Sequence, residues 1–502
     1  MNRSYKTFIC CVCLLASISM LSGCSDWLDL KPENDLTEEE FWQNQNQASA
    51  ALAGVYTSMR ANVRYYYAWG EMRGGFMDPG VSTADNDEGK WRKAMTKIIE
   101  QKDYNPANLA FYWGGLYRTI KNVNNLIAHM PQVLANDASF SELEANTYLA
   151  EAKFVRALMY FYLVRTFHKV PLVTDPYISD DSDFFVPQSP TSEVMKLIYE
   201  DLKFAERYCR DGFEEVEFSK GRATKGAVRA LLADVYLWED RYDDCLQAIQ
   251  RLEESGAYGL IAKEEWRTNF YPGNTNESIF EIQFDAEMDQ AGSLSRDIGQ
   301  SAIFRFSEQY MLLTNEIEEA DVRGDYGTFI KDDEILTPLK YFAGEIKKSS
   351  NGPAIIVIPD PNYIIYRYAD ILLLKAEALA ESNKLAEAWR ALNRVRTRAG
   401  AVPFPVLDNN KDEFYSRYMD ERTFELAFEG KRWFDLLRLA KRNDFEKKDL
   451  VINILVQGLK ASEQQLMRNR LANTLGFYLP IKESEIRNNP SLEQNPYYGN
   501  RQ

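Results

Sequence analysis

Two parts of this chain repeat one pattern, in which a helix, a short turn and a second helix follow one another. Residues 233–249 align with residues 376–392, and the tetrapeptide Val-Arg-Ala-Leu at 155–158 recurs at 228–231. A unit of about 30 residues of this kind is typical of tetratricopeptide-type repeats, which cannot bury their apolar faces alone and therefore stack. The repetition predicts a mostly α-helical fold built on a tetratricopeptide-like scaffold of helix pairs.

Apolar residues recur at steps of three and four over much of the remaining chain, which predicts further helices. Thr37 and the three acids after it are typical of a helix start, and we expect this helix to run to Tyr56. The other predicted helices cover residues 111–130, 142–168, 191–211, 222–239, 242–255, 364–381, 384–399, 412–442 and 449–470. Residues 62–110 and 257–363 lose this period, so we expect long, loop-rich insertions with a few short strands, such as 279–282.

The first residues have the features of an exported lipoprotein. Arg3 and Lys6 precede an apolar stretch too short to span a bilayer comfortably, and Leu-Ser-Gly-Cys at 21–24 follows it. We predict a signal peptide at 1–23 that is removed, and a diacylglycerol attached to the thiol of Cys24. The alternative is an ordinary secretory signal in which this cysteine occurs by chance.

The rest of the chain reads as one folded unit behind a tether. Residues 24–36 are short, polar and proline-containing, which is typical of a tether. We expect residues 37–502 to form a single unit, with an N-terminal region at 37–220 and a C-terminal region at 221–502.

Composition argues against nucleic-acid binding and offers little catalytic chemistry. The net charge is −16 and the pI is about 4.9, so the surface repels phosphate backbones. The chain has two histidines, and it lacks both the His-Glu-x-x-His zinc motif and the Gly-x-Ser-x-Gly nucleophile motif. We therefore expect no enzyme activity, no metal centre and no cofactor, although 75 acidic residues leave a pair of glycosidase carboxylates open. We interpret Cys209 and Cys245 as buried thiols, with a disulfide between them as the alternative.

Aromatic and polar residues are interleaved in the two irregular segments. The residues that stand out are Tyr65, Tyr67, Trp69, Arg73, Asp78, Trp91, Tyr271, Phe284 and Phe304. A flat ring stacks on the apolar face of a sugar, while carboxylate, amide and guanidinium groups bond its hydroxyls. We interpret some of these residues as a ligand platform. The alternative is that the aromatic rings attach long loops to the helices.

The charged stretch at 421–438 has the appearance of an active site. Its spacing places Glu425, Glu429 and Arg432 on one helical face, with Asp435 one turn further along. Opposite charges three and four residues apart pair with each other, so we interpret them as structural ion pairs.

Several motifs, in this order, resemble one known family. The most specific is E-R-x-x-E-L-x-F-E-G-x-R-W-x-D-L-x-R at 421–438, and other matching stretches lie at 24–32, 37–56, 150–162, 221–227, 277–282 and 479–496. Together they resemble the SusD/RagB family, the outer-membrane nutrient-binding lipoproteins of Bacteroidetes. The resemblance covers essentially the whole chain after the signal peptide.

The resemblance implies a surface glycan-binding lipoprotein without catalytic activity. Such a protein sits on the outer face of the outer membrane, captures an oligosaccharide and passes it to a SusC-like TonB-dependent transporter. We expect the ligand to be held by Tyr67, Trp69, Arg73, Asp78, Trp91, Tyr271 and Phe304. Two alternatives stay open: a helical-repeat envelope scaffold without sugar affinity, and a peptide- or glycoprotein-binding member of the same family.

Overall fold

The computed structural model describes residues 41–499 with several gaps. The gaps are residues 81–85, 177–184, 286, 289, 291, 293, 299–302, 333–334, 342–345, 350–351 and 356–360. The predicted signal peptide, the tether, Cys24 and the predicted helix start at Thr37 lie outside the described residues. Within the described ranges, each helix is too short or too polar to cross a bilayer.

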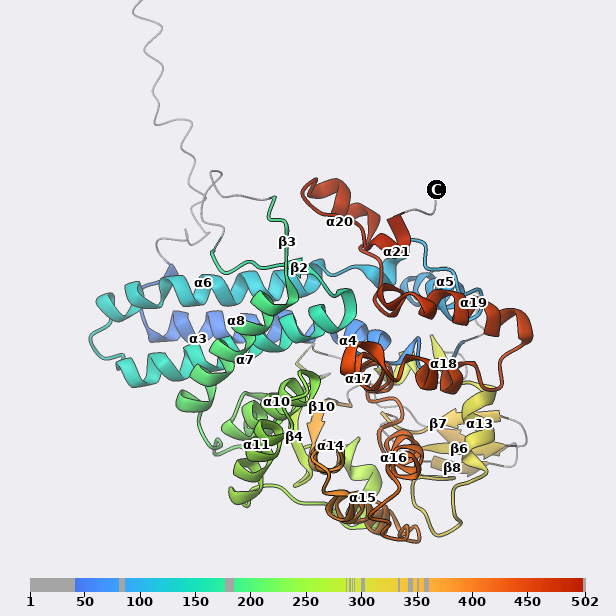
Figure 1. The fold of residues 1–502 in the computed structure, drawn as a ribbon. Coiled ribbons are helices and arrows are strands. Elements are labelled where there is room, and N and C mark those ends of the chain that lie inside the picture. The colour runs from blue at the N-terminus through green and yellow to red at the C-terminus, as the bar shows by residue number, and fades with distance from the viewer. Residues whose placement is uncertain are drawn as a thin grey trace, which may run out of the picture.

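Four long helices form one layer of the molecule (Figure 1). They are α3 (Gln45–Arg60), α6 (Gly114–Asn136), α7 (Glu142–Phe167) and α8 (Thr191–Tyr208). Helix α6 packs against α3 and α7, and α8 lies along α7. Helix α3 begins with a capping box, because Asn44 Oδ1 accepts from the Gln47 amide at 3.2 Å and Gln47 Oε1 accepts from the Asn44 amide at 3.1 Å.

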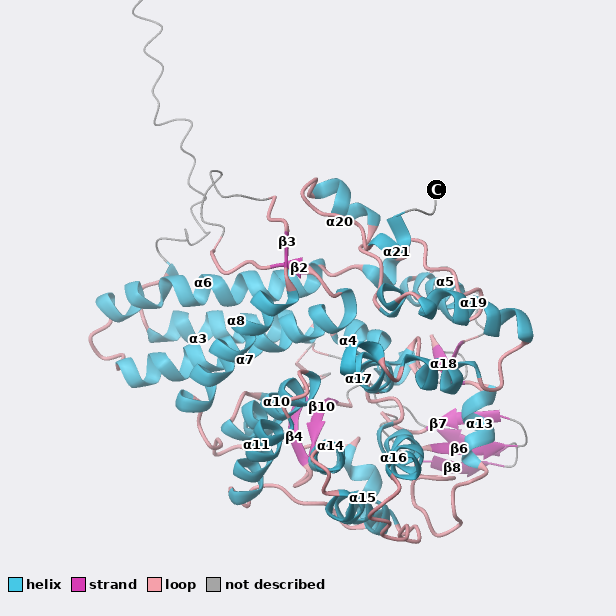
Figure 2. Cartoon of the chain, viewed as in Figure 1, coloured by secondary structure: helices cyan, strands magenta, loops and turns pink. Residues whose placement is uncertain are grey.

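Helix pairs continue from this layer and stack on one another, and most of the chain is helical (Figure 2). The pairs are α10 (Lys225–Trp238) with α11 (Tyr242–Glu254), and α14 (Tyr368–Glu381) with α15 (Leu385–Ala399). Helix α10 packs on α8, α11 packs on α14, and α15 packs on α16 (Lys411–Leu426). The two sequence repeats coincide with these neighbouring pairs, which confirms the mostly α-helical, tetratricopeptide-like scaffold.

The described strands form five two-stranded antiparallel ribbons. The pairs are β1 (Met77–Pro79) with β5 (Phe304–Phe306), β2 (Val170–Pro171) with β3 (Gln188–Ser189), β4 (Ser278–Ile282) with β10 (Tyr363–Arg367), β6 (Phe329–Asp332) with β7 (Ile335–Pro338), and β8 (Ile346–Ser349) with β9 (Gly352–Ile355). Strand β4 confirms the strand predicted at 279–282. The β1–β5 ribbon joins the two segments that the sequence presents as irregular, with Met77 opposite Phe306.

The prediction of a loop-dominated region at 62–110 is wrong. This region contains α4 (Val63–Glu71), α5 (Asp87–Ile99) and the short η2 (Leu109–Phe111). Every residue of α4 from position 66 to position 71 is buried. Helix α4 has only nine residues, so it contains too few turns for an apolar period to be recognised in the sequence.

The helix predicted at 412–442 is two helices, α16 and α17 (Arg432–Phe445). The chain breaks between them, with positive φ at Phe428 (64°) and Gly430 (71°). At the break the backbone of Gly430 presses against α4, because a Cβ on Gly70 would lie 1.9 Å from the Gly430 carbonyl oxygen. The break therefore seats the C-terminal region on α4.

The predicted helix at 449–470 is also divided, into α18 (Lys448–Val456) and α19 (Ala461–Ala472). The short elements that complete the fold are α9 (Val216–Gly221), η3 (Lys263–Asn269), α12 (Leu294–Asp297), α13 (Glu308–Thr314), η4 (Thr474–Phe477), α20 (Glu483–Asn488) and α21 (Pro496–Gly499).

Buried ion pairs hold the helices of the C-terminal region together. Arg367 at the end of β10 has no exposed surface and pairs with Glu277 at 2.6 Å, Glu425 at 2.5 Å and Glu429 at 2.8 Å. Glu425 and Glu429 are therefore structural, as predicted, but their partners lie on other elements. The break between α16 and α17 moves Arg432 away from both carboxylates.

The two cysteines of the folded part are free and buried, which confirms the interpretation of Cys209 and Cys245 as thiols. Burial raises the pKa of both thiols well above the ordinary value.

The segment at 474–499 returns to the N-terminal layer. The Leu479 amide donates to the carbonyl of Thr166 at 2.9 Å, and the Glu483 amide donates to the carbonyl of Pro106 at 3.0 Å. The indole of Trp113 donates to the Glu485 carboxylate at 3.1 Å. This segment thereby closes one edge of the α6–α7 layer.

Candidate functional site

An open cavity of about 650 Å³ lies where α3, α4 and α5 meet Phe284, Met288 and Gln290. Its lining residues are Thr57, Arg60, Ala61, Val63, Arg64, Tyr65, Trp91, Phe284, Met288 and Gln290. The volume falls within the usual range for small-molecule sites, about 300–1,000 Å³. The cavity brings together the two aromatic-rich segments that the sequence singled out.

Three aromatic rings border the cavity. Tyr65 and Trp91 meet edge to face, with ring centroids 5.1 Å apart and an interplanar angle of 66°. Phe284, which belongs to the second irregular segment, is half-buried and also lines the cavity. Burial, and next the neighbouring Tyr112, raise the pKa of Tyr65 to about 12, so its hydroxyl stays protonated at neutral pH and can donate a hydrogen bond.

Two arginines fix the geometry of this cavity. Arg64 on α4 makes a bidentate pair with Asp297, through Nε at 2.8 Å and Nη2 at 2.9 Å, and its Nη1 donates to Asp87 at 2.6 Å. Its guanidinium carbon lies 5.4 Å from the centroid of the Trp91 ring. Arg60, at the end of α3, donates to the carbonyl of Gln283 at 3.3 Å and to the Gln290 side chain. Both arginines thus tie the 283–297 segment to the helices.

This arrangement suits the binding of an uncharged polar ligand. Ring faces and edges contact apolar C–H groups, while the guanidinium N–H groups, the Gln290 amide and the Tyr65 hydroxyl offer hydrogen bonds. Among the described lining residues there is no carboxylate. In the described part of the chain, no three His, Cys, Asp or Glu side chains come close enough to hold a metal ion together.

Three of the predicted ligand residues are core residues, which corrects that prediction. Tyr67, Trp69 and Phe304 have no exposed surface. The Trp69 indole donates to the carbonyl of Ala110 at 2.7 Å, and Tyr67 meets Phe304 edge to face at 5.1 Å. Because these rings cover the β1–β5 ribbon and the buried face of α4, none of them presents a face to a ligand.

Arg73 is also a core residue and not a surface one. Its side chain is 3 % exposed, its guanidinium lies 4.1 Å over the Trp433 ring, and Nη1 donates to the Phe477 carbonyl at 2.6 Å. Burial lowers its pKa to about 9. The prediction that Arg73 bonds a ligand is therefore corrected as well.

The three remaining predicted residues lie in different places. Trp91 lines the cavity, although its side chain is only 5 % exposed. Asp78 is half-buried on β1, 3.9 Å from Arg305, and Tyr271 is half-buried after η3; neither lines the cavity. For these three residues, ligand binding stays a prediction.

Sequence reasoning missed Arg60 and Arg64. They stand four residues apart, and neither has an acid three or four positions away with which to pair on its own helix. That missing local partner is the signal that both side chains reach toward a different segment.

Family models match both ends of the chain. The model described as "SusD family" matches residues 355–498, and the one described as "Starch-binding associating with outer membrane" matches residues 26–237. A protein of Formosa agariphila named SusD-like protein P38 is 27 % identical to this chain, over 88 % of this chain and 92 % of that protein.

Solved structures share the fold. A SusD superfamily protein from Bacteroides thetaiotaomicron superposes with a TM-score of 0.71 at 20 % identity, over 91 % of this chain and 99 % of the other. A structure described as a laminarin-binding SusD-like protein gives a TM-score of 0.69 at 24 % identity, over 91 % and 100 %.

Proposed function

Because this chain belongs to the SusD/RagB family, we propose that it is a glycan-binding protein and not an enzyme. The observation that carries the proposal is the cavity at α3, α4 and α5, where Tyr65, Trp91 and Phe284 meet two anchored arginines. Rings for stacking and fixed donors for hydroxyl groups are what a saccharide requires. The match to a starch-binding family and the likeness to a laminarin-binding protein support a glycan as the ligand.

The proposed setting is the outer membrane. The Leu-Ser-Gly-Cys pattern at 21–24 supports a lipid anchor at Cys24, with the folded part on the outer surface, and the matched family is described as associating with this membrane. From there the protein would pass its oligosaccharide to a SusC-like TonB-dependent transporter. Two or three acyl chains on Cys24 would give stable attachment to this membrane.

The first test measures binding to two glucans. Purified protein is titrated with laminarin and with soluble starch, by calorimetry and by retardation in glycan-containing gels. We expect one of them to bind, and we expect Phe284→Ala and Trp91→Ala to weaken that binding by about fivefold, which is the effect of losing about 1 kcal/mol of stacking. Phe218→Ala is the matched control, because Phe218 is 51 % exposed on α9 and lines no part of this cavity.

Each other outcome identifies an alternative. If neither glucan nor a wider glycan panel binds, the protein is a scaffold or a binder of peptide or glycoprotein. If a glycan binds and both cavity variants keep wild-type affinity and stability, the ligand sits elsewhere and this cavity is not the site.

A further inference from the structure

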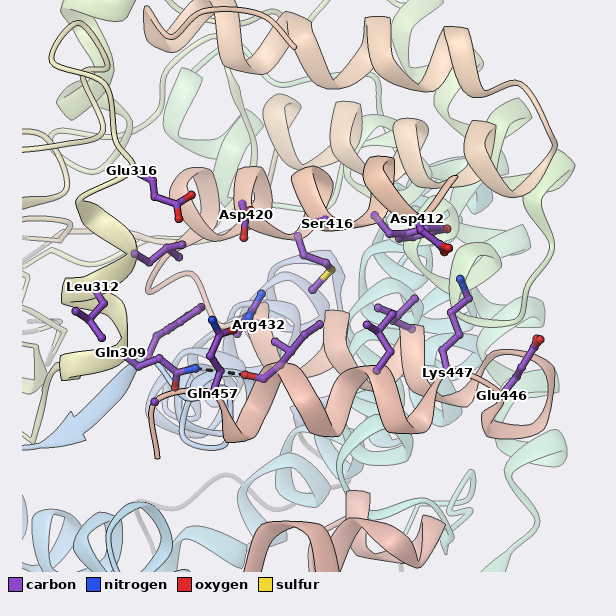
Figure 3. Close-up of a pocket in the computed structure, with 18 residues that line it drawn as sticks. Gln309, Leu312, Glu316, Asp412, Ser416, Asp420, Arg432, Glu446, Lys447 and Gln457 are labelled. Carbon is purple, nitrogen blue, oxygen red and sulfur yellow. Dashed lines mark hydrogen bonds between the residues drawn. The ribbon is translucent and has the colours of Figure 1, made fainter. Parts of the chain in front are cut away.

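A second cavity, of about 670 Å³, lies between α13, α16, α17 and α18 (Figure 3). It shares no lining residue with the cavity at α3, α4 and α5. Its volume again falls within the range of small-molecule sites, about 300–1,000 Å³.

The lining of this second cavity includes a buried cation that forms no ion pair among the described residues. Arg432 at the start of α17 is 9 % exposed. Within the described part of the chain, its only hydrogen bond runs from Nη1 to the Thr423 hydroxyl at 3.0 Å, and no carboxylate forms an ion pair with it. Its guanidinium lies 4.5 Å from the centroid of the Phe76 ring. Burial lowers the pKa of Arg432 to about 10.

The neighbouring buried arginines differ from Arg432, because each of them forms an ion pair. Arg422, Arg438 and Arg442 are all buried, and each pairs with a carboxylate at 2.5–3.0 Å. A buried charge without a partner is costly, and such groups are concentrated at functional sites. Arg73 and Arg470 also have no carboxylate partner among the described residues, but the rings of Trp433 and Tyr104 cover them and neither lines this cavity.

A carboxylate faces Arg432 across the second cavity. Asp420 projects from α16 toward the space into which Arg432 points from α17 (Figure 3). Asp420 is half-buried, and the two groups form no ion pair among the described residues. Burial raises the pKa of Asp420, and the charge of Arg432 partly offsets this rise. Glu316, two residues after the end of α13, lies on the same side of the cavity and adds negative charge near Asp420.

The rest of the lining combines apolar side chains with Asp412, Glu446 and Lys447, which stand at the other end of the cavity from Asp420 (Figure 3). Leu313, Met419, Leu439 and Ile454 line the cavity, and they can contact the apolar body of a ligand. A ligand carboxylate near Arg432 would also face Asp420 and Glu316, and a ligand amine near Asp420 would face Arg432. A hydroxyl avoids both conflicts, because its oxygen accepts from the guanidinium and its hydrogen donates to the carboxylate.

We propose that the second cavity binds a small neutral ligand that has an apolar body and hydroxyl groups, one of which is held between Arg432 and Asp420. An aryl glycoside has this chemistry: an uncharged polyol joined to a flat apolar group. This site is additional to the proposed glycan site, and apart from Phe76 its lining residues come from the C-terminal region.

The test compares three probes on the full protein. Phenyl β-glucoside is the neutral polyol, phenyl β-glucuronide adds a carboxylate, and benzylamine replaces the polyol with a cation. Binding is measured by saturation-transfer NMR and calorimetry at millimolar concentrations. We expect the glucoside to bind and each charged probe to bind at least about tenfold more weakly, because each places a like charge beside Arg432 or Asp420.

Variants locate the binding. We expect Asp420→Asn and Arg432→Met each to weaken glucoside binding by about tenfold, the effect of a lost hydrogen bond to a charged group. Asp449→Asn, an exposed α18 acid outside the cavity, and Trp91→Ala, at the other site, should leave it unchanged. If Arg432→Met does not fold, the glucoside affinity of Asp420→Asn is the deciding measurement. The proposal is overturned if the glucoside does not bind, if Asp420→Asn binds it normally, or if a charged probe binds equally well.

Discussion

Glu71 is a buried carboxyl group that forms no ion pair among the described residues. Its side chain is 3 % exposed at the end of α4 and accepts from the amides of Gly430 at 2.9 Å and Lys431 at 3.2 Å. Burial raises its pKa to about 8, because these two amides only partly offset the loss of water. The folded protein therefore holds this group neutral at pH 7.

This raised pKa predicts that Glu71→Gln stabilises the protein more as pH rises. Between about pH 5 and 8 the unfolded chain releases the Glu71 proton and the folded chain keeps it, so the wild-type free energy of unfolding falls by about 1.4 kcal/mol per pH unit from this group. Glutamine does not titrate and loses nothing over this interval. Urea unfolding at several pH values measures the difference.

The matched control for this experiment is Glu200→Gln, because the Glu200 side chain is 61 % exposed. Its effect on stability should be small and independent of pH. A constant difference between Glu71→Gln and wild type across this range would mean that Glu71 is ionised in the folded protein.

The type of a residue indicates which ligands its side chain can bind, but it does not indicate whether the side chain is buried. Tyr67, Trp69 and Phe304 were chosen because aromatic rings bind sugars, yet the same rings are the largest apolar groups available to a core. Trp91 came from the same reasoning and does line the cavity. A single sequence does not separate these two uses, because burial depends on which distant elements cover a ring.

Two glycines in helices differ in the space available for a side chain. A Cβ on Gly70 of α4 would lie 1.9 Å from the carbonyl oxygen of Gly430. A Cβ on Gly54 of α3 would meet nothing within 4 Å. The contact at Gly70 is backbone against backbone, so no side chain can move aside to relieve it.

The prediction at this scale is that Gly70→Ala destabilises the protein by about 3 kcal/mol or more, because α4 must separate from the break between α16 and α17. Gly54→Ala is the control, and it should stabilise by up to about 1 kcal/mol, because alanine favours a helix over glycine. Thermal and urea unfolding measure both variants. Equal effects would show that α4 does not sit against Gly430.

Long helices were predictable and a short one was not. Helices α6, α7, α8, α10 and α11 appear where apolar residues recur at helical steps, even though α7 is almost wholly buried. Helix α4 has only nine residues, too few turns for an apolar period to stand out, so the sequence predicts a loop there. The break between α16 and α17 was missed because the period continues through it, and only the close contact with α4 requires it.

At the scale of the whole molecule, one arginine connects parts that are far apart in the chain. Arg367 joins Glu277 beside β4 to Glu425 on α16 and to Glu429 in the break after it. All four groups are almost completely buried. Arg367, and next Lys340, hold the pKa of Glu429 below its ordinary value despite burial.

We predict that Arg367→Met destabilises the protein by about 3–5 kcal/mol, because it leaves three buried carboxylates short of a partner. Arg417→Met is the matched control. Arg417 is 43 % exposed and pairs with Glu413 one turn away, so its loss should cost less than about 1 kcal/mol. Urea unfolding at neutral pH compares the two. A small effect of Arg367→Met would mean that the carboxylates take up protons or find other cations.

The architecture as a whole was the most predictable feature. The repeats at 233–249 and 376–392 specify helix pairs that stack, and the structure contains them as α10–α11 and α14–α15. The arrangement of the insertions was not predictable, because it depends on pairings such as Arg64 with Asp297, more than two hundred residues apart. A cavity formed by such pairings has no local signature in the sequence.

The return of residues 474–499 to the N-terminal layer has a consequence for how the protein is made. The carbonyls of Pro106 and Thr166 receive their partners from Glu483 and Leu479, which the ribosome adds several hundred residues later. A nascent or newly exported chain therefore carries an unfinished edge until this late segment arrives. During that interval the carbonyls at this edge lack their partners, and chains with such incomplete packing are prone to aggregate.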